Sequence, residues 1–361
     1  MSAYFADLIK FYLNVAKNSD ASDSIRILAL AFIMQASVYK KVKYQKLGLI
    51  GITLDAILPI AAEVEPSDRD EQYPGKVALQ VLNSLATTFP PNHVFPSVMS
   101  IVVNYSQQEN PELRKASMLA LAVLVEGCAD HMRERIGDIL PIIIRMLQDP
   151  FPVVRRCACT ALGSLCEELD SEVVEQHGVL FPLLFSLLGD ENSQIHPNVL
   201  NTLDSLVESM EDSIQLYLEP LMGKLISLLT SPSRKVVLTT VNCIGSVAHA
   251  AGTDFLPYFE VTMQKLQLLM SIENKDDLEI RGVATDAVST VAEAVGRDAF
   301  APYMNGVMKL AVSGITLDNS RLRECSYVFF GVLSRVFGVC VLFFWSFIIA
   351  IILIFTNSCS F

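Results

Sequence analysis

The chain has 361 residues, of which 52% are hydrophobic and 18% charged, with only 17 glycines and 16 prolines. This composition is typical of a folded, helix-rich protein and excludes a disordered or collagen-like one. The formal net charge of −12 argues against a nucleic-acid binder, because such a protein needs a basic surface to neutralise phosphates. An acidic surface suits basic protein partners instead.

The amino-terminal stretch MSAYFADLIKFYLNVAKN places charges within an amphipathic pattern and lacks the apolar core of a signal peptide. At Arg26 it is followed by the segment SIRILALAFIMQA, in which small and apolar residues recur at helical spacing. We therefore expect the first element to be a helical hairpin near residues 2–45.

The segment around Arg26 is one copy of a repeat. Four other arginines are followed by small or apolar residues three, six, seven and ten positions later: Arg114, Arg155, Arg281 and Arg323. Degenerate copies lie around Gly75 or Lys76, His196 and Val237. A second marker, a proline after one or two apolar residues, recurs every 37 to 45 residues at Pro59, Pro96, Pro141, Pro182, Pro220, Pro257 and Pro302. Such a period indicates a repeat architecture.

Each period holds a proline-marked apolar helix, a polar break and a second helix. In the copy at Arg155, one helical face carries Val154, Ala158, Ala161, Leu165 and Leu169. The preceding QDPFP cannot continue a helix and predicts the turn between the two helices. We expect Pro141 near the first turn of its helix, where its missing N–H costs little.

Every helix pair has apolar residues on more than one face, so no pair can bury its surface alone, and stacking solves that problem. The sequence predicts an all-α, HEAT/armadillo-type superhelical solenoid of about eight helix pairs within residues 1–338. The pairs are expected near residues 2–45, 46–91, 92–130, 131–170, 171–211, 212–252, 253–297 and 298–338.

The carboxyl-terminal residues 339–361 differ from the rest. VCVLFFWSFIIAIILIF, Val339–Phe355, carries no charge and, with the three neutral residues before it, is long enough to span a bilayer as a hydrophobic helix. Two interpretations remain open: a genuine membrane anchor, or a gene-model artefact such as a translated intron. The absence of a basic cluster on its carboxyl-terminal side counts against an anchor.

No catalytic motif is present: the chain lacks a phosphate-binding glycine loop, a G-x-S-x-G elbow and an H-E-x-x-H helix. The five histidines are scattered among different repeats, and the eight cysteines form no C-x-x-C pair. We expect reduced, buried thiols, no catalytic residues, no metal and no cofactor. The sequence does not predict an enzyme.

The proline-marked first helices and the segment DPFPVVRRCACTALGSL resemble the HEAT repeats of the importin-β, or karyopherin-β, nuclear transport receptors. Two further segments, IRILALAFIMQASVYKKVKYQKL and LPIAAEVEPSDRDEQYPGKVALQVLNSLA, resemble the importin-four branch of that family. The resemblance covers about residues 1–338. Because family members are roughly three times longer, the chain resembles an internal block of their repeats.

The resemblance implies a receptor that carries basic cargo, such as ribosomal proteins or histones, through nuclear pores. It implies Phe-Gly nucleoporins as partners along the first helices, and Ran GTPase as the regulator, although the family's amino-terminal Ran site is not matched here. It implies a cytoplasmic and nuclear location, including the nuclear envelope and pore, with membrane anchoring only if residues 339–355 are a genuine span. No nucleic-acid partner is expected.

In importin-like arrays the second helices line the inner side, so acidic residues there are candidates for binding Lys/Arg-rich cargo. These are Glu126, Glu167, Glu168, Asp204, Glu208, Asp286 and Glu293. An ordinary solvated face is the alternative for each of them. The loop EVEPSDRDEQ is a second candidate, through Glu63, Glu65, Asp68, Asp70 and Glu71. It either contacts cargo or Ran, or simply connects two helices.

The main alternative to a transport receptor is a HEAT-repeat structural scaffold for a multiprotein complex. Such a scaffold would grip folded partners through the loops within its repeats. A single stoichiometric partner would favour the scaffold, and salt-sensitive binding of Lys-rich segments would favour the receptor.

Overall fold

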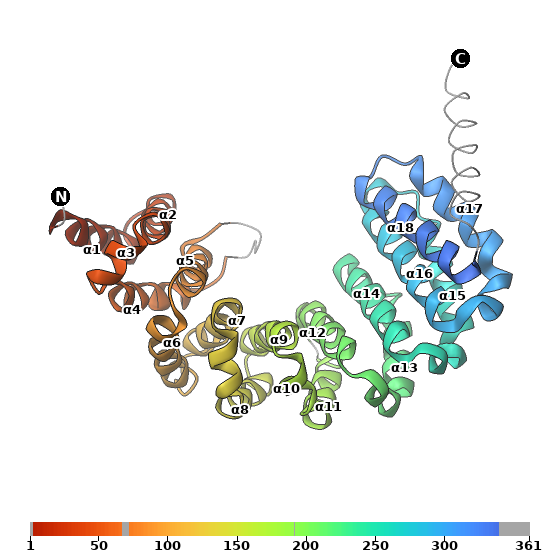
Figure 1. Ribbon diagram of the computed structural model, residues 1–361, viewed down its shortest axis with the longest axis horizontal. Helices are drawn as coiled ribbons and strands as arrows, with labels where there is room; N and C mark the ends of the chain where they lie inside the picture. The colour runs from red at the N-terminus through yellow and green to blue at the C-terminus, as the bar shows by residue number, and fades with distance from the viewer. Residues whose placement is uncertain (1–2, 67–71, 191, 339–361) are drawn as a thin grey trace, which may run out of the picture. The chain divides into compact units, whose positions relative to one another are not determined.

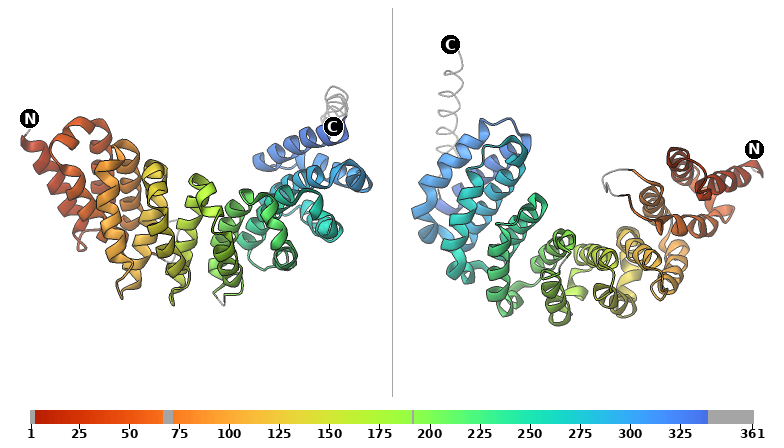
Figure 2. Two further views of the ribbon diagram at one scale, coloured as in Figure 1. Left: turned by 60° about the horizontal axis from the view of Figure 1, so that its bottom comes forward. Right: turned by 180° about the vertical axis from the view of Figure 1, so that it is seen from behind.

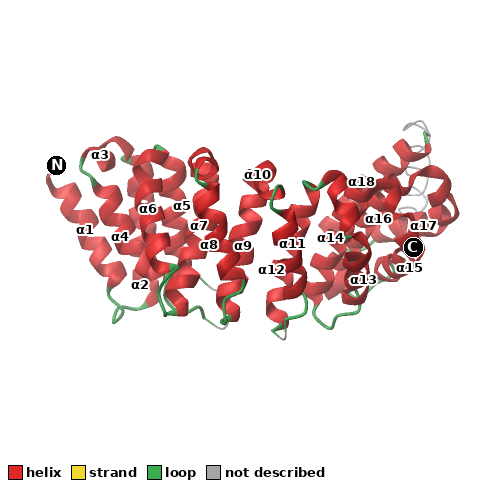
Figure 3. Cartoon of the chain, turned by 90° about the horizontal axis from the view of Figure 1, so that it is seen from below, coloured by secondary structure: helices red, strands yellow, loops and turns green. Residues whose placement is uncertain are grey.

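The computed structural model describes residues 3–66, 72–190 and 192–338 (Figure 1). Within these ranges every regular element is a helix, and no strand is present (Figure 3). The expected hydrophobic helix at 339–355 lies outside the described residues, as do Asp68, Asp70 and Glu71 of the acidic loop.

The helices divide between two compact units, residues 1–202 and residues 203 onward. The first unit contains α1 (Ala3–Lys17), α2 (Asp23–Tyr39), α3 (Lys41–Lys46), α4 (Leu49–Ala61), α5 (Pro74–Thr88), α6 (Pro91–Tyr105), α7 (Pro111–Glu134), α8 (Ile136–Leu147), α9 (Pro152–Glu168), α10 (Asp170–Val174) and α11 (His177–Leu187). The short 3-10 helix η1 (Ser193–Ile195) leads into α12 (His196–Glu208), which crosses the boundary between the units.

The second unit continues with η2 (Glu211–Leu216), α13 (Leu218–Leu228), α14 (Arg234–Ala251), η3 (Gly252–Phe255), α15 (Leu256–Met270) and η4 (Lys275–Asp277). It ends with α16 (Leu278–Phe300), η5 (Ala301–Tyr303), α17 (Met304–Ile315) and α18 (Ser320–Phe337). Within each unit the helices pack as antiparallel pairs that follow one another along the chain (Figure 2).

Two rows of helices result in each unit. In residues 1–202 the second helices α2, α5, α7 and α9 pack in series, and so do the first helices α1, α4 and α6. In the second unit α14, α16 and α18 form one row, and α13, α15 and α17 form the other. The core lies between the rows, where each hairpin buries its apolar faces against its partner helix and its neighbours.

Local sequence explains where the helices begin. Pro74, Pro111 and Pro152 occupy the first turns of second helices, where a missing N–H costs little. Ser233 and Asn319 instead cap α14 and α18 by accepting the N–H groups of Val236 and Leu322. These caps follow directly after the polar breaks that the repeat pattern predicts.

The position of one marker proline differs from the expectation. Pro141 is the sixth residue of α8, which begins at Ile136, so it lies in the second turn rather than the first. The helix starts earlier because it follows α7 after the single residue Arg135, which makes a tight connection between hairpins. Pro141 therefore leaves the carbonyl of Gly137 without its helical N–H partner.

Small residues allow close packing between second helices. A Cβ atom placed on Gly127 of α7 would lie 2.3 Å from the carbonyl oxygen of Ala86 in α5. Because backbone atoms meet there, only glycine fits this position.

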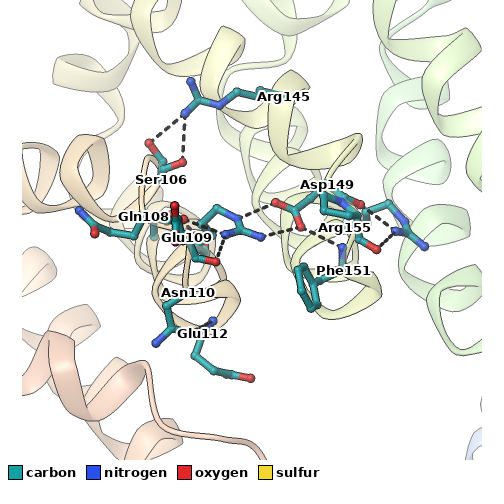
Figure 4. Close-up of polar contacts among 12 residues, drawn as sticks. Ser106, Gln108, Glu109, Asn110, Glu112, Arg145, Asp149, Phe151 and Arg155 are labelled. Carbon is teal, nitrogen blue, oxygen red and sulfur yellow. Dashed lines mark hydrogen bonds and ion pairs between the residues drawn. The ribbon is translucent and has the colours of Figure 1, made fainter.

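The repeat arginines of the first unit join neighbouring hairpins (Figure 4). Arg114 donates from Nε to Asp149 Oδ2 at 2.6 Å, and Arg155 donates from Nε to Asp190 Oδ2 at 2.9 Å. Arg155 also donates to the carbonyl oxygen of Asp149 at 2.7 Å. In the second unit Arg281 instead donates to the carbonyl oxygens of Ile272 and Leu310.

One described helical stretch, Arg234–Met270, is long and apolar enough to cross a membrane. It comprises α14, η3 and α15, and 61% of its most apolar window is buried inside the protein. Such burial is the behaviour of core helices in a hairpin array.

Candidate functional site

Four of the predicted acidic residues line one groove in the second unit. The groove has a volume of about 550 Å³ and lies across α12, α14 and α16. Asp204 and Glu208 come from α12, and Asp286 and Glu293 come from α16. The remaining lining residues are uncharged apart from a histidine: Asn242, Gly245, Ser246, His249, Val283, Ala287 and Thr290.

The repeat register explains this convergence. Glu208, His249 and Glu293 each stand twelve residues after an aligned repeat position, namely His196, Val237 and Arg281. Equivalent positions of stacked helices lie side by side, so Glu208, His249 and Glu293 line the same groove. This common spacing is a signal in the sequence that separates these residues from other surface carboxylates.

The floor of the groove is made of small residues. A Cβ atom on Gly245 of α14 would lie 3.8 Å from the Cα atom of Ala287 in α16, so the two helices approach closely. Asn242, Ser246 and Thr290 add amide and hydroxyl groups near this floor. An extended peptide could therefore reach the floor with its backbone while its side chains meet the carboxylates.

Asp204 has an unusual environment in the groove. Burial raises the pKa of Asp204 to about 6, and the nearby charge of Glu208 acts in the same direction, whereas a hydrogen bond from Ser246 opposes the shift. Its Oδ1 atom is buried and has no hydrogen-bond partner among the described residues. A cation that approaches this carboxylate would stabilise its charged form.

The other carboxylates of the groove are more exposed. Glu208 accepts a hydrogen bond from Ser246 Oγ at 3.3 Å. Burial raises the pKa of Asp286, and the positive charge of Arg321 opposes this shift. Glu293 pairs with Arg335 of α18 at 2.8 Å, and both side chains are exposed to solvent. The groove therefore carries more negative than positive charge.

Glu126, Glu167 and Glu168 do not line this groove. They lie on α7 and α9 of the first unit and all three are exposed, Glu126 within α7 and Glu167 and Glu168 at the carboxyl-terminal end of α9. Glu126 and Glu167 occupy the same repeat register as Glu208, twelve residues after Arg114 and Arg155. Glu168 lies one residue outside that register.

The acidic loop between α4 and α5 is tied to the first unit by ion pairs. Glu63 accepts from Arg26 Nη1 at 3.0 Å, and the Glu63 carbonyl accepts from Lys115 Nζ at 2.6 Å. Glu65 pairs with Arg156 of α9 at 2.5 Å, and the two side chains are only 15% and 13% exposed. These two acidic residues thus have cationic partners inside the chain, which the sequence alone did not indicate.

A second groove lies on the first helices of unit one. Its volume is about 900 Å³, and it runs between α6 and α8. Phe95, Pro96, Met99, Val103 and Ile142 form the apolar part of its lining, and the charged part consists of Glu134, Arg135, Asp138 and Arg145. Phe181 and Phe259, two aromatic residues of first helices, are buried in the core.

The cysteines of the described residues are buried in the hairpin core, and none forms a disulfide. Burial raises the pKa of Cys128 to about 11 and that of Cys166 to about 12, so both are thiols at neutral pH. No group of three or more His, Cys, Asp or Glu side chains in the described part of the chain is arranged to hold a metal ion.

Comparison with known proteins gives several matches. Residues 66–310 match the family model described as TORTIFOLIA1 N-terminal. The probable importin subunit beta-4 of Schizosaccharomyces pombe is 35% identical over 340 residues, covering 93% of this chain and 32% of that protein. Importin-4 of Homo sapiens is 29% identical over 153 residues, covering 38% of this chain and 14% of that protein.

Solved structures share the fold. Kap121p bound to Pho4p matches with a TM-score of 0.82 and 22% identity, over 93% of this chain and 34% of that one. Kap121p bound to Nup53p matches equally well, with a TM-score of 0.82. These matches confirm the predicted all-α HEAT-type fold and the resemblance found in the sequence. The chain spans about a third or less of the length of these relatives. The chain resembles the importin-β family over nearly its whole length and, through residues 66–310, belongs to the family described as TORTIFOLIA1 N-terminal.

Proposed function

We propose that the chain is part of a nuclear transport receptor, and that the groove across α12, α14 and α16 binds a Lys/Arg-rich segment of its cargo. The observation that carries this proposal is the convergence of Asp204, Glu208, Asp286 and Glu293 around one groove. The resemblance to the importin-β family supports the same function. Neither line of support involves an enzymatic step, so the proposed activity is binding.

The chemistry of the groove favours lysine. A lysine ammonium is a compact charge on a flexible stem, so it can reach a recessed carboxylate such as Asp204 through a narrow opening. Its N–H groups would satisfy the buried Oδ1 atom of Asp204 and lie between Asp204 and Glu208, which otherwise repel each other as i, i+4 neighbours. Arginine or lysine at further positions would meet Asp286 and Glu293.

Basic cargo of the proposed receptor would include ribosomal proteins or histones, since both present exposed Lys/Arg-rich segments. Ran would regulate release in the longer protein, and the receptor would move between cytoplasm and nucleus. Kap121p has been solved bound to Pho4p, to the extreme C-terminus of the protein phosphatase Cdc14p and to the SUMO protease Ulp1p, which supports protein binding by this fold.

The groove between α6 and α8 is proposed as a site for Phe-Gly nucleoporins. Its apolar lining can hold a phenylalanine ring, and Kap121p has been solved with Nup53p. Val103 is 41% exposed at this groove, so Val103→Glu should fold normally while placing a charge against an incoming ring. Loss of Phe-Gly peptide binding by this variant would support the site, and unchanged binding would exclude it.

A peptide titration tests the cargo proposal. The full chain is titrated with a fluorescent Lys-rich peptide of about twelve residues, and a peptide with every lysine replaced by glutamine serves as the reference. We expect submicromolar binding of the Lys-rich peptide that weakens steeply with salt. The variant Asp204→Asn/Glu208→Gln/Asp286→Asn/Glu293→Gln should lose about tenfold to a hundredfold in affinity, at 1.4 kcal/mol per tenfold change.

A matched control removes the same charge from the same unit. Glu260, Glu279, Asp298 and Asp318 are exposed and lie outside the groove, so their amide variants change the net charge equally. Equal loss by both variants would mean that only the overall charge matters, and the groove would not be the site.

The scaffold alternative makes a different prediction. A scaffold would retain one folded partner in a stoichiometric complex that survives high salt, and the groove variant would not release it. Recovery of such a complex, without binding of the Lys-rich peptide, would replace the receptor proposal.

A further inference from the structure

Positive charge gathers at the connection between α2 and α4, where Figure 1 shows the short helix α3. Lys40, Lys41, Lys43 and Lys46 fall within seven residues of a chain whose net charge is −12. Lys43 lies 4.7 Å from the centre of the Phe5 ring, so we restrict the name lysine patch to Lys40, Lys41 and Lys46. Lys40, Lys41 and Lys46 are exposed, and no ion pair or side-chain hydrogen bond involves them among the described residues.

The arginines of the same unit behave differently. Arg26, Arg114, Arg155 and Arg156 each pair with a carboxylate of another hairpin. The first unit therefore uses arginine to join its hairpins, whereas the lysine patch joins nothing. Its charge is available to a partner.

Apolar side chains accompany the patch. Tyr39 is 76% exposed and Val42 is 65% exposed, which places both among the most exposed large hydrophobic residues of the described chain. They lie beside Lys40 and Lys41 in the sequence and on the same connection. A partner that covers the patch would remove this apolar surface from water at the same time.

The patch is held in a fixed position by one buried residue. Tyr44 of α3 is fully buried, its ring centroid lies 6.4 Å from that of Phe5 and 5.8 Å from that of Phe89, and its hydroxyl contacts Thr53. Tyr44 thus fastens α3 to α1, α4 and the end of α5. A surface fixed before binding loses less entropy when a partner arrives.

We propose that the lysine patch, with Tyr39 and Val42, is a docking surface for an acidic peptide segment of a partner protein that also carries an aromatic or aliphatic residue. The charge of this surface is opposite to that of the cargo groove, so the proposal stands independently of the proposed function. The acidic side chains would meet Lys40, Lys41 and Lys46, and the apolar residue would pack on Tyr39 and Val42.

The short distance over which charges interact in salt solution favours a peptide over a membrane as the partner of the lysine patch. At physiological ionic strength charges interact over about 8 Å, so a short peptide on α3 would respond mainly to the lysine patch. An anionic bilayer is an extended surface and would also meet the acidic remainder of the chain. A single short basic segment supplies one weak membrane signal, whereas stable attachment needs two.

Fluorescence anisotropy with the full chain tests the proposal. The probe is a labelled synthetic peptide of about twelve residues in which glutamates surround two phenylalanines. We expect saturable binding at low salt, and at least a tenfold loss of affinity in Lys40→Glu/Lys41→Glu/Lys46→Glu. Tyr39→Ser should weaken binding of this peptide about threefold. It should have a much smaller effect on the binding of a second peptide in which alanine replaces both phenylalanines.

The matched control is Lys10→Glu/Lys17→Glu/Lys235→Glu, which makes the same charge change at exposed lysines outside the patch. It should bind the acidic peptide within about twofold of the unchanged protein, and circular dichroism should show that both variants fold. Equal losses in the two triple variants would overturn the proposal. It would also be overturned if the patch variant lost binding to phosphatidylserine vesicles or to a single-stranded oligonucleotide while the acidic peptide never bound.

Discussion

The two units of the chain use acidic residues near their second helices in opposite ways. In residues 1–202, Asp149, Asp190 and Glu65 each face an arginine from another hairpin. In the second unit, Asp204 keeps a buried oxygen without a partner, and Arg281 donates to backbone carbonyls rather than to a carboxylate. A carboxylate with an arginine opposite it stabilises the array, and one without a counter-charge is available to bind a cation.

The pKa values of two aspartates show the same difference. Burial tends to raise the pKa of Asp190, but hydrogen bonds from the Asn192 N–H and from Arg155, together with the charge of Arg155, lower it overall. Burial raises the pKa of Asp204 to about 6, because no cation compensates. The presence of the arginine decides the direction of the shift.

The largest effect is expected from Asp149→Ala. The Arg114 and Asp149 side chains are only 10% and 4% exposed, so the substitution leaves a guanidinium buried without its carboxylate. We expect a loss of about 3–5 kcal/mol in the free energy of unfolding, measured by guanidinium denaturation. The exposed Asp318→Ala should change it by less than about 0.5 kcal/mol. A loss below about 1 kcal/mol at Asp149 would contradict the stabilising role of the pair.

Asp204→Asn should raise the free energy of unfolding, whereas Asp149→Ala lowers it. Because the pKa of Asp204 is raised in the folded state, the folded chain binds more protons than the unfolded chain between pH ~4 and ~6. The contribution of this group to stability therefore falls as the pH rises through that window. At pH 7 we expect the free energy of unfolding of Asp204→Asn to exceed that of the unchanged chain by about 1–3 kcal/mol, since one pKa unit corresponds to about 1.4 kcal/mol.

The same variant at pH ~4 should be almost as stable as the unchanged chain, because Asp204 is then protonated in the folded state. If the free energies of unfolding of the variant and the unchanged chain differed by the same amount at every pH from ~4 to ~7, Asp204 would not carry an uncompensated charge.

A smaller effect is expected from the pair of Glu65 and Arg156. Its partners are 91 residues apart, and it joins the loop after α4 to α9 across the intervening hairpin of α6 and α7. A double-mutant cycle with Glu65→Gln and Arg156→Gln should give a coupling free energy of about 1 kcal/mol. Hydrogen exchange should show faster opening of α9 in both single variants. Additive effects in the cycle would mean that the pair does not couple the two hairpins.

The smallest expected effect is a pH dependence of peptide binding. Protonation of Asp204 near pH 6 removes one negative charge from the groove. We expect affinity for the Lys-rich peptide to fall several-fold from pH 7 to pH 5 in a titration series. Asp204→Asn should reduce this pH dependence, and an unchanged profile in that variant would show that Asp204 is not the group responsible.

Much of the fold could be predicted because the repeat pattern reflects local physics. Polar breaks such as QDPFP end helices wherever they occur, and the face with Ala158 and Ala161 can pack only against another helix. The depth of Pro141 within α8 could not be predicted, because it depends on how tightly α7 connects to α8. The division of the chain at Thr202 has no marker in the repeat pattern.

The candidate site was predicted in part. Asp204, Glu208, Asp286 and Glu293 were all candidates from the sequence and gather in one groove, and two of them, Glu208 and Glu293, share the spacing of twelve residues after a repeat position. The ion pairs of Glu63 and Glu65 could not be predicted from the sequence, because the partners Arg26 and Arg156 come from other hairpins. Composition shows that a loop is acidic, but only tertiary packing shows whether its charges are already matched.

Cross-linking of a bound peptide would test most directly whether unmatched carboxylates make the binding site. The full chain is mixed with the Lys-rich peptide and treated with a carbodiimide, which joins lysine amines to carboxylates in direct contact, and the products are mapped by mass spectrometry. We predict cross-links at Asp204, Glu208 and Asp286, and none at Asp149, Asp190 or Glu65, whose carboxylates face arginines. Cross-links spread evenly over exposed acidic residues such as Glu260 and Asp318, without enrichment in the groove, would contradict the proposed site.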